Sequence, residues 1–413
     1  MRAPRLGALR QPGCMQTIVK TTKPQDLLAL VPHLVGFRPS NSLVLVAFRG
    51  KRTGGAYRVD LPAPASDLVY KRIATTLIGM LCRIEGADGV VPVIYTDDRF
   101  DECGGIPRET LARRLISRAR SAGFDVKEAL CVAQDGWGSY YDDEGAGQQP
   151  LEMIDESAAH TALAGTDEPP LTTPDERAKL PASTLLRQEA VARQIERLKA
   201  EFAQCVATDS DPVGEIGIGG DPAMVLDGWT NPVGVAEMAI GWQSDRLDPA
   251  CTALIVLAAQ LPRIRDVLLY DWAWGAEAGR IAHGTNLRYA RGESLDEDED
   301  GMLALAGMGM PRPDPKRIKR AIELLGRVTA DAPRLTRPPL LTMLGWLHWA
   351  LGSGSTAGLH IDAALAIDPD YGLADLVDTM LSQGLLPEWS FERPELDGDE
   401  RIISLPVDDD SDR

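Results

Sequence analysis

The sequence predicts an α/β N-terminal domain, with a mixed sheet flanked by helices, followed by an all-α, repeat-like C-terminal domain. Three observations lead to this fold class. Short apolar runs alternate with amphipathic segments as far as residue 142. Apolar residues then recur at helical spacing from residue 186 onward. Finally, 413 residues are many for one hydrophobic core, so more than one domain is expected.

The first elements follow one another closely along the chain. Residues 24–34 begin with a proline and carry leucines at helical spacing, and Gly36 ends this helix. Residues 43–48, "LVLVAF", form an apolar run of strand length, which is typical of an interior strand covered on both faces. The glycine-rich turn after it leads into a second strand at 56–62, so the two strands form a hairpin.

Helices and strands then alternate, which implies at least one parallel pair of strands. A helix is expected from Ser66 to Glu85, a third strand at 89–98, a second helix at 107–123, and a hairpin at 125–141. The first of these two helices should bury one stripe of side chains, formed by Val69, Ile73, Leu77, Met80 and Ile84.

Composition sets the expected domain boundaries. Residues 1–14 lack apolar periodicity and are expected to be a disordered extension before an α/β domain at 15–142. Residues 143–185 are rich in proline, glycine and acidic residues, which predicts a connector with a short helix at 151–164. The helical domain is placed at 186–390, and residues 391–413 are expected to be an acidic tail.

The most patterned part of the helical domain is residues 338–384, which resemble a tetratricopeptide repeat. Gly345 and Ala357 would let two antiparallel helices approach closely, and Pro369 would stop the second helix. Only one clear copy is present. Because a single repeat cannot bury its own apolar face, it must pack on the helices that precede it.

Several segments together resemble one family. They include "DLLALVPHLVGFRPSNSLVLVAF", "VVPVIYTDD" and "LLTMLGWLHWALGSG", and the resemblance runs from about Asp26 to Trp389. The chain is similar to the actinobacterial domain-of-unknown-function family 4192. That resemblance implies an actinobacterium or one of its phages as the source, and an uncharacterised protein without an assigned reaction. Members often carry a cysteine- and proline-rich segment after the "SY" pair. Its counterpart here, "SYYDDEGAGQQP", has no cysteine, which argues against a thiolate metal site.

Two loops contain candidate site residues. In "GFRPSNS", Arg38 and Asn41 could present hydrogen-bond donors to an anion, although the same residues suit a structural helix-to-strand turn. After the third strand, Asp97 and Asp98 could hold Mg²⁺, and Asp60 could join them if strand pairing brings the strand ends together. The alternative for these acids is a loop that caps the next helix. No cofactor is predicted beyond this possible Mg²⁺.

Charge and motifs narrow the function classes. The net charge of −18 argues against nucleic acid as a partner, although arginines at 113, 114, 118 and 120 keep that option open. Six scattered cysteines without a C-x-x-C pair suggest reduced thiols and a cytoplasmic location. No apolar run is long enough to predict a membrane helix. No nucleophile-elbow, zinc-protease or phosphate-loop motif occurs.

Two hypotheses remain. The first is a cytosolic protein-interaction or scaffold module that binds another protein through its helical domain. The second is a metal-dependent hydrolase or nucleotide-handling enzyme, with Asp97 and Asp98 as ligands and Arg38 holding an anion. Convergence of Arg38, Asp60, Asp97 and Asp98 in one pocket would favour the second hypothesis.

Overall fold

The computed structural model describes residues 19–20, 23–141, 147–164, 173–207, 231–293, 301–392 and 403–404. The chain divides into two compact units, residues 1–172 with 391–413 and residues 173–390. The first contains a mixed sheet with helices and the second is helical, so the predicted fold class is confirmed. The expected extension at 1–14 lies outside the described residues.

One mixed sheet organises the first unit, with described strands in the order β1-β7-β3-β2-β4-β5-β6. The central strand β2 runs antiparallel to both of its neighbours, and β4 and β5 form a parallel pair. The last strand, β7, comes from the 391–413 segment that was expected to be an acidic tail. The strands are β1 (Val19–Lys20), β2 (Ser42–Arg49), β3 (Arg52–Asp60), β4 (Gly89–Tyr95), β5 (Leu130–Val132), β6 (Trp137–Ser139) and β7 (Ile403–Ser404).

Strand β2 is buried on both faces, as its continuous apolar run predicts. Leu43, Leu45 and Ala47 pack into one core cluster, and Val44, Val46 and Phe48 pack into another on the opposite face. Each of these six side chains is at most 1 % exposed. Burial of a Val, Leu or Phe side chain stabilises a fold by roughly 1.5–3 kcal/mol, so this strand stabilises the cores on both sides of the sheet.

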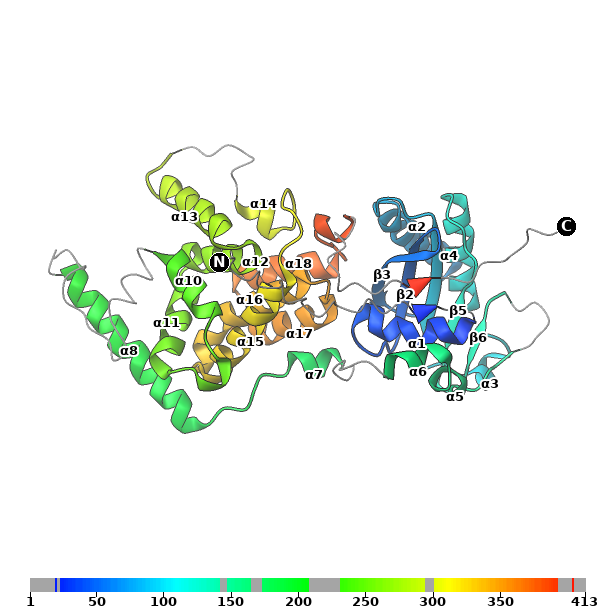
Figure 1. Cartoon of the computed structure of the whole chain (residues 1–413), viewed down its shortest axis with the longest axis horizontal. Helices are drawn as coiled ribbons and strands as arrows, with labels where there is room; N and C mark the ends of the chain where they lie inside the picture. The colour runs from blue at the N-terminus through cyan, green and yellow to red at the C-terminus, as the bar shows by residue number, and fades with distance from the viewer. Residues whose placement is uncertain are drawn as a thin grey trace, which may run out of the picture. The chain divides into compact units, whose positions relative to one another are not determined.

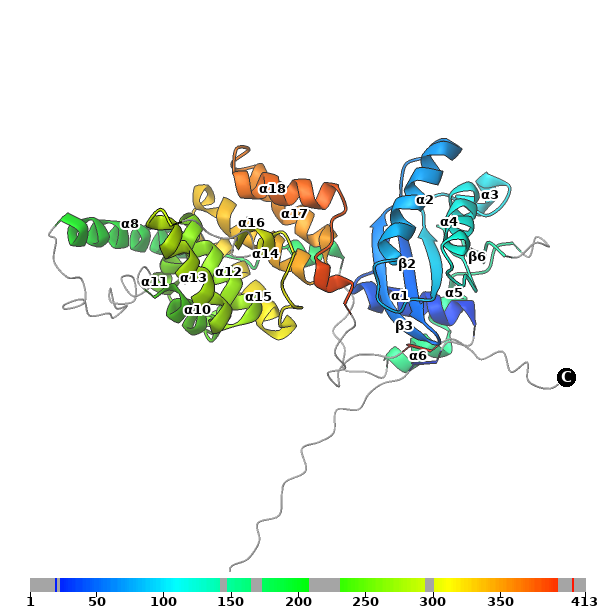
Figure 2. The same cartoon turned by 90° about the horizontal axis from the view of Figure 1, so that it is seen from above.

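Helices cover the two faces of the sheet (Figures 1 and 2). One face packs against α1 (Pro24–Val35), with α5 (Glu152–Asp155) and α6 (Ala158–Ala164) beside it. The other face packs against α2 (Asp67–Leu81) and α4 (Glu109–Ser121). The short helix α3 (Phe100–Cys103) follows β4.

The buried side of α2 differs from the predicted one. Leu77 is buried as expected, but Val69 is 41 % exposed, and the other side chains that the helix buries are Tyr70, Ala74, Ile78 and Leu81. Apolar residues lie on both sides of this helix, so spacing alone does not choose between them. Ala74 belongs to the core cluster shared with α4, and the Tyr70 hydroxyl accepts a hydrogen bond from the Ala65 amide at 3.1 Å.

The second unit is built from helices alone among its described residues. None of the described helices is both long enough and apolar enough to cross a bilayer. The α-helices are α7 (Pro174–Ala178), α8 (Leu185–Ala207), α10 (Pro232–Ile240), α11 (Pro249–Gln260), α12 (Pro262–Trp274), α13 (Ala276–Ala290), α14 (Gly301–Leu305), α15 (Pro315–Asp331), α16 (Arg337–Ala350), α17 (Gly354–Leu365) and α18 (Gly372–Ser382). Three short 3-10 helices are η1 (Ser244–Arg246), η3 (Arg334–Thr336) and η4 (Glu388–Ser390).

Helix α16 lies at the centre of this unit, since every residue from Pro338 to Ala350 is buried. Trp346 and Trp349 belong to an aromatic cluster with Trp274 and Trp389, in which neighbouring rings lie 5.6–6.4 Å apart. Each of these indoles donates its N–H to a backbone carbonyl oxygen. Trp346 and Trp349 therefore lie in the core, with their polar atoms satisfied.

Helices α16 and α17 pack closely at Gly345. A Cβ atom at this position would lie 2.7 Å from Cδ1 of Ile361 and 3.2 Å from the carbonyl oxygen of Ala357. A side chain at this position would force Ile361 to move, so glycine favours the close approach of the two helices, as the sequence pattern suggests. The packed helical hairpin is observed, while its identity as a tetratricopeptide repeat stays a prediction.

Candidate functional site

The candidate site residues at the ends of the strands meet at one edge of the sheet. Ser42, the first residue of β2, pairs with Asp60 at the end of β3 on one side and with Tyr95 at the end of β4 on the other. Strand pairing therefore brings Asn41, Asp60 and the loop that begins at Thr96 to the same edge. We call this region the strand-end site.

Asn41 and Asp97 bind each other across this edge. The Asn41 side-chain amide donates to Oδ2 of Asp97, and the Asp97 backbone N–H donates to Oδ1 of Asn41 at 3.1 Å. This pair fastens the turn before β2 to the loop after β4. The Asp97 carboxylate is therefore already engaged by a neighbour within the chain.

Asp98 has a different partner. Arg108, directly before α4, donates from Nε to Oδ2 of Asp98 at 2.5 Å and from Nη1 to the carbonyl oxygen of Pro62 at 3.3 Å. The arginine is mostly buried, with 14 % of its side chain exposed. Because Arg108 binds a carboxylate and a backbone carbonyl, it joins the loops that follow β3 and β4.

The remaining two candidates do not join these contacts. The Asp60 carboxylate pairs with Arg58 on its own strand at 2.6 Å, and 87 % of its side chain is exposed. Arg38 is exposed, and among the described residues it has no hydrogen bond or ion pair. Within the described part of the chain, no group of three or more His, Cys, Asp or Glu residues is arranged to hold a metal ion.

Backbone strain marks the strand-end site. In the described part of the chain, Asn41 at φ 42° and Arg108 at φ 61° are the non-glycine residues with positive φ. This conformation is uncommon outside glycine, and for a long side chain such as arginine it is costly. Both residues hold the carboxylates of the acidic loop, so that loop is maintained at an energetic cost.

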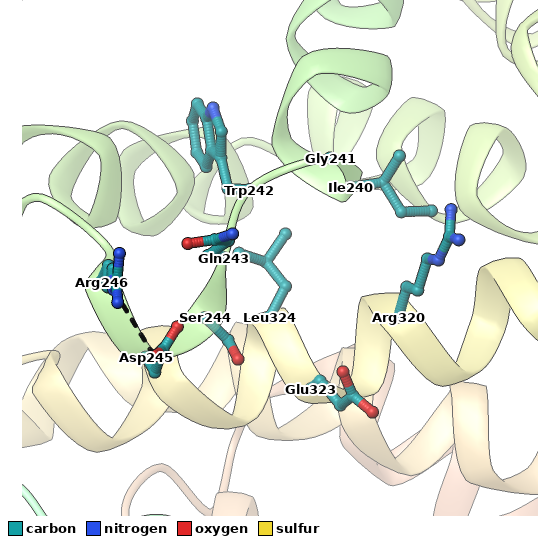
Figure 3. A pocket seen from close by; sticks show the side chains of 10 residues that line it. All are labelled: Ile240, Gly241, Trp242, Gln243, Ser244, Asp245, Arg246, Arg320, Glu323 and Leu324. Atoms are coloured by element: carbon teal, nitrogen blue, oxygen red, sulfur yellow. Dashed lines mark ion pairs between the residues drawn. The ribbon is translucent and has the colours of Figure 1, made fainter.

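A second candidate site is a surface pocket of the helical unit, shown in Figure 3. Its volume is about 610 Å³, and it lies between the end of α10, the segment at 242–246 and the middle of α15. The lining residues are Ile240, Gly241, Trp242, Gln243, Ser244, Asp245, Arg246, Arg320, Glu323 and Leu324. Figure 3 shows Ile240 and Arg320 on one side, the 242–246 segment on the other, and Leu324 between them.

Two side chains in this pocket carry charges that nothing else in the described chain neutralises. Arg320 and Glu323 lie three residues apart on α15, and both are exposed without a hydrogen bond or ion pair to described residues. The other two charged residues form an exposed ion pair, in which Nε of Arg246 lies 3.9 Å from Oδ2 of Asp245. The pocket thus offers one cation and one anion that are not already paired.

A buried charge network holds the first turn of α15. Arg317 donates from Nη2 to the Asp271 carboxylate at 2.9 Å and to the Glu237 carboxylate at 2.6 Å, and also binds the Asp271 carbonyl oxygen. Asp271, on α12, is 0 % exposed. Its burial, together with the nearby Glu237 carboxylate, raises the pKa of Asp271. Through Glu237 this network attaches α10, which forms one wall of the pocket.

A second buried carboxylate, Asp331, holds the last turn of α15. Its oxygens accept hydrogen bonds from Ser183 at 2.6 Å, from Arg327 at 2.6 Å and from Arg187 on α8. The side chain of Asp331 is 0 % exposed. Arg187 also donates to the carbonyl oxygen of Leu247, the residue that follows η1. The facing wall of the pocket is therefore tied to the same helix.

These networks fix the geometry of the pocket. Each end of α15 is held by a buried aspartate, and each wall is connected to one of the two networks. Arg320, Glu323 and Leu324 lie on the stretch between them. A charged site on a rigid element loses little entropy when it binds a ligand, so this arrangement suits recognition.

No motif in the sequence indicates the pocket. Its lining residues come from 240–246 and 320–324, which are distant in the chain and match no motif. Arg108 could have been noticed as a basic residue placed before a helix and ten residues after Asp98. The two buried aspartates look like ordinary helix residues until tertiary packing shows that they are fully covered.

The fold and the pocket define a class of protein in which an α/β unit is joined to a helical unit with a charged surface pocket. The chain belongs to the family of the domain of unknown function DUF4192, whose model matches residues 24–283 and 299–388. The match includes residues of both units and of the pocket. No curated protein and no solved structure matches the chain significantly.

Asp331→Asn should destabilise the helical unit by about 3–5 kcal/mol, because it removes one partner from a buried charge network. Chemical denaturation followed by tryptophan fluorescence measures this, since of the eight tryptophans only Trp137 lies outside residues 173–390. Asp245→Asn, an exposed change in the pocket itself, is the control and should stay within about 0.5 kcal/mol of wild type. Equal stability of the two variants would show that Asp331 does not anchor α15.

Two histidines are stacked in the core of the helical unit. His348 on α16 and His360 on α17 have ring centroids 5.3 Å apart, and they are 7 % and 3 % exposed. Burial lowers the pKa of His348 to about 3, with His360 and Arg177 adding to the effect, and burial lowers that of His360 to about 4. Both side chains are therefore neutral in the folded protein near pH 5.

This pair should make the helical unit less stable as the pH falls. Both folded pKa values lie below the unfolded value near 6.5, so their contribution is complete above pH ~6.5 and is lost as the pH falls toward 4. The double variant His348→Phe, His360→Phe keeps two rings but cannot titrate. Between pH 7.5 and 5.5, wild type should lose about 2–3 kcal/mol more unfolding free energy than the variant.

Comparison with this variant separates the pH-dependent stability contributed by the histidines from that contributed by Asp271. The raised pKa of Asp271 favours the folded state as the pH falls, which is the opposite direction. Because Asp271 is present in both proteins, its contribution cancels in the difference. An identical pH dependence of the two unfolding curves would contradict the assignment of neutral buried histidines.

Proposed function

We propose that the chain is a protein-interaction module whose helical unit carries the binding surface. The observation that supports this proposal is the pocket between α10, η1 and α15. Two charged side chains, Arg320 and Glu323, are exposed there without partners in the described chain, on a helix that buried networks hold at both ends. Unpaired, fixed charges beside the half-buried side chain of Trp242 suit recognition of a protein segment.

The α16–α17 hairpin adds a weaker argument. If it is a tetratricopeptide-like end, as its spacing suggests, the helical unit resembles domains that present surfaces to peptides. That step is fold analogy and carries less weight than the pocket. An actinobacterial source and a cytoplasmic location complete the proposal. The four described cysteines, Cys82, Cys103, Cys131 and Cys251, are free thiols, as a reducing compartment would leave them.

A capture experiment tests the proposal. The full chain is immobilised and exposed to an extract of its source organism, beside the double variant Arg320→Ala, Glu323→Ala. Wild type should retain a partner that the variant loses, because both substitutions remove exposed charges without opening the core. The retained protein is then purified, and its Kd is measured by titration calorimetry.

A matched variant in the other unit serves as the control. The double variant Asp97→Asn, Asp98→Asn should retain the same partner as wild type. If the partner is lost with this variant and kept with Arg320→Ala, Glu323→Ala, binding belongs to the strand-end site. If both variants retain everything that wild type retains, the pocket is not the binding surface.

The second candidate function is a metal-dependent hydrolase or nucleotide-handling enzyme at the strand-end site. The observation in its favour is the strained backbone of Asn41 and Arg108, because strain of this kind tends to occur at functional sites. Asp97 and Asp98 would then release Asn41 and Arg108 to take Mg²⁺, and Arg38 would meet the anion. The contacts that already occupy both carboxylates make this the weaker proposal.

Metal addition tests the second candidate. If Asp97 and Asp98 bind Mg²⁺, millimolar MgCl₂ should raise the Tm of the first unit. At a Mg²⁺ concentration ten times Kd, the gain in unfolding free energy is about 1.4 kcal/mol. The shift should vanish in the double variant Asp97→Asn, Asp98→Asn and persist in Asp101→Asn, Glu102→Gln, which changes two acids of the adjacent helix α3. Differential scanning calorimetry measures it, and an equal shift in all three proteins would mean binding elsewhere.

A further inference from the structure

We infer that the pocket binds a segment of a partner protein that carries one acidic and one basic side chain about one helical turn apart, with an apolar side chain beside them. This inference rests on the proposed function, since it names the chemistry of the ligand for the same pocket. It follows from the charges of the pocket, their spacing and the apolar part of the pocket lining.

The spacing of the two charges comes first. Side chains three residues apart on a helix are neighbours, with Cβ atoms about 5–6 Å apart. Arg320 and Glu323 stand in this relation on α15, and they form no ion pair with each other. The Arg320 guanidinium can hold a carboxylate through two parallel hydrogen bonds, while Glu323 can accept from an ammonium or guanidinium group. A ligand that satisfies both must carry opposite charges at a similar spacing.

The balance of charge argues against ligands of one sign. The pocket contains two arginines and two acids, of which Asp245 and Arg246 pair with each other. A wholly acidic segment would meet Glu323 and a chain with a net charge of −18. A wholly basic segment would place a second cation against Arg320. A mixed segment avoids both repulsions.

Part of the lining adds an apolar requirement. Trp242 is half-buried and lines the pocket together with Leu324 and Ile240, which are 2 % and 9 % exposed. The pocket volume of about 610 Å³ has room for more than the ends of two charged side chains. An apolar side chain next to the charged pair would pack against Trp242 and exclude water from the two ion pairs, which strengthens them.

The two buried networks explain why this recognition can be selective. Arg317 is one turn before Arg320, and Arg327 is one turn after Glu323 on the same helix. Both are held by fully buried aspartates, so the stretch between them cannot shift to accommodate a different spacing. A ligand with the wrong separation of charges would leave one of them unpaired.

Defined peptides test the inference on the full chain. The probes are 15-residue, alanine-based, fluorescein-labelled helical peptides that share one leucine. At two positions three residues apart they carry Glu and Lys in either order, two Glu, two Lys or two Gln. Binding is followed by fluorescence anisotropy at low ionic strength, where exposed ion pairs are least screened.

The mixed peptides should bind roughly 3- to 30-fold more tightly than the two-Gln peptide, as expected for two exposed ion pairs. Arg320→Glu should move the preference to the two-Lys peptide, and Glu323→Arg should move it to the two-Glu peptide. Because these switches do not depend on the direction in which a peptide lies, they report the pocket charges alone.

Matched charge changes on α4 are the controls. Arg113→Glu and Glu109→Arg alter the net charge by the same amounts at exposed positions of the other unit, and should leave the preference unchanged. Tightest binding of the two-Lys peptide to wild type and all variants would show that only net charge matters, and would overturn the inference. Equal affinity of wild type for all peptides would also overturn the inference. If a partner is still captured through Arg320 and Glu323, the proposed function survives without this ligand class.

Discussion

The helical unit depends on two carboxylates that have no contact with solvent. Asp271 and Asp331 are both fully buried, and each meets the arginines that border the middle of α15. A buried carboxylate costs several kcal/mol to remove from water, and only close, well-directed partners offset that cost. The helices that supply those partners therefore have little freedom. Asp331 alone draws together residues 144 and 148 positions away in the chain.

Such networks contribute more to geometry than to stability. Well-packed apolar residues in the same places often give an equal or more stable fold, whereas an ion network fixes which helix meets which. In this unit the fixed element is α15, and the walls of the pocket are tied to it through Glu237 and Leu247. The pocket is thus formed before any ligand arrives. The acids of the α/β unit act differently, because Asp97 and Asp98 hold loops together within their own neighbourhood.

Much of the fold could be predicted because local patterns determine it. The apolar run of β2 requires cover on both faces, and the proline and glycine around α1 define its ends. The edge where Asn41, Asp60 and Asp97 meet follows from antiparallel pairing, which the hairpin at 43–62 already suggests. The buried face of α2 was predicted only in part: Ile73 and Leu77 pack on the core, but Val69 is exposed and Tyr70 is buried, because packing against α4 decides between the two apolar stripes. Strand β7 and the pocket depend on contacts between distant residues, for which one sequence contains no periodic signal.

Hydrogen exchange of the full chain, alone and with its captured partner, tests the central claim most directly. If the helical pocket is the binding surface, the partner should slow exchange of backbone amides in residues 240–247 and 317–324. Amides of residues 36–41 and 96–108, at the strand-end site, should exchange at the same rate with and without partner. Protection confined to the strand-end residues, with no change along α15, would contradict the account.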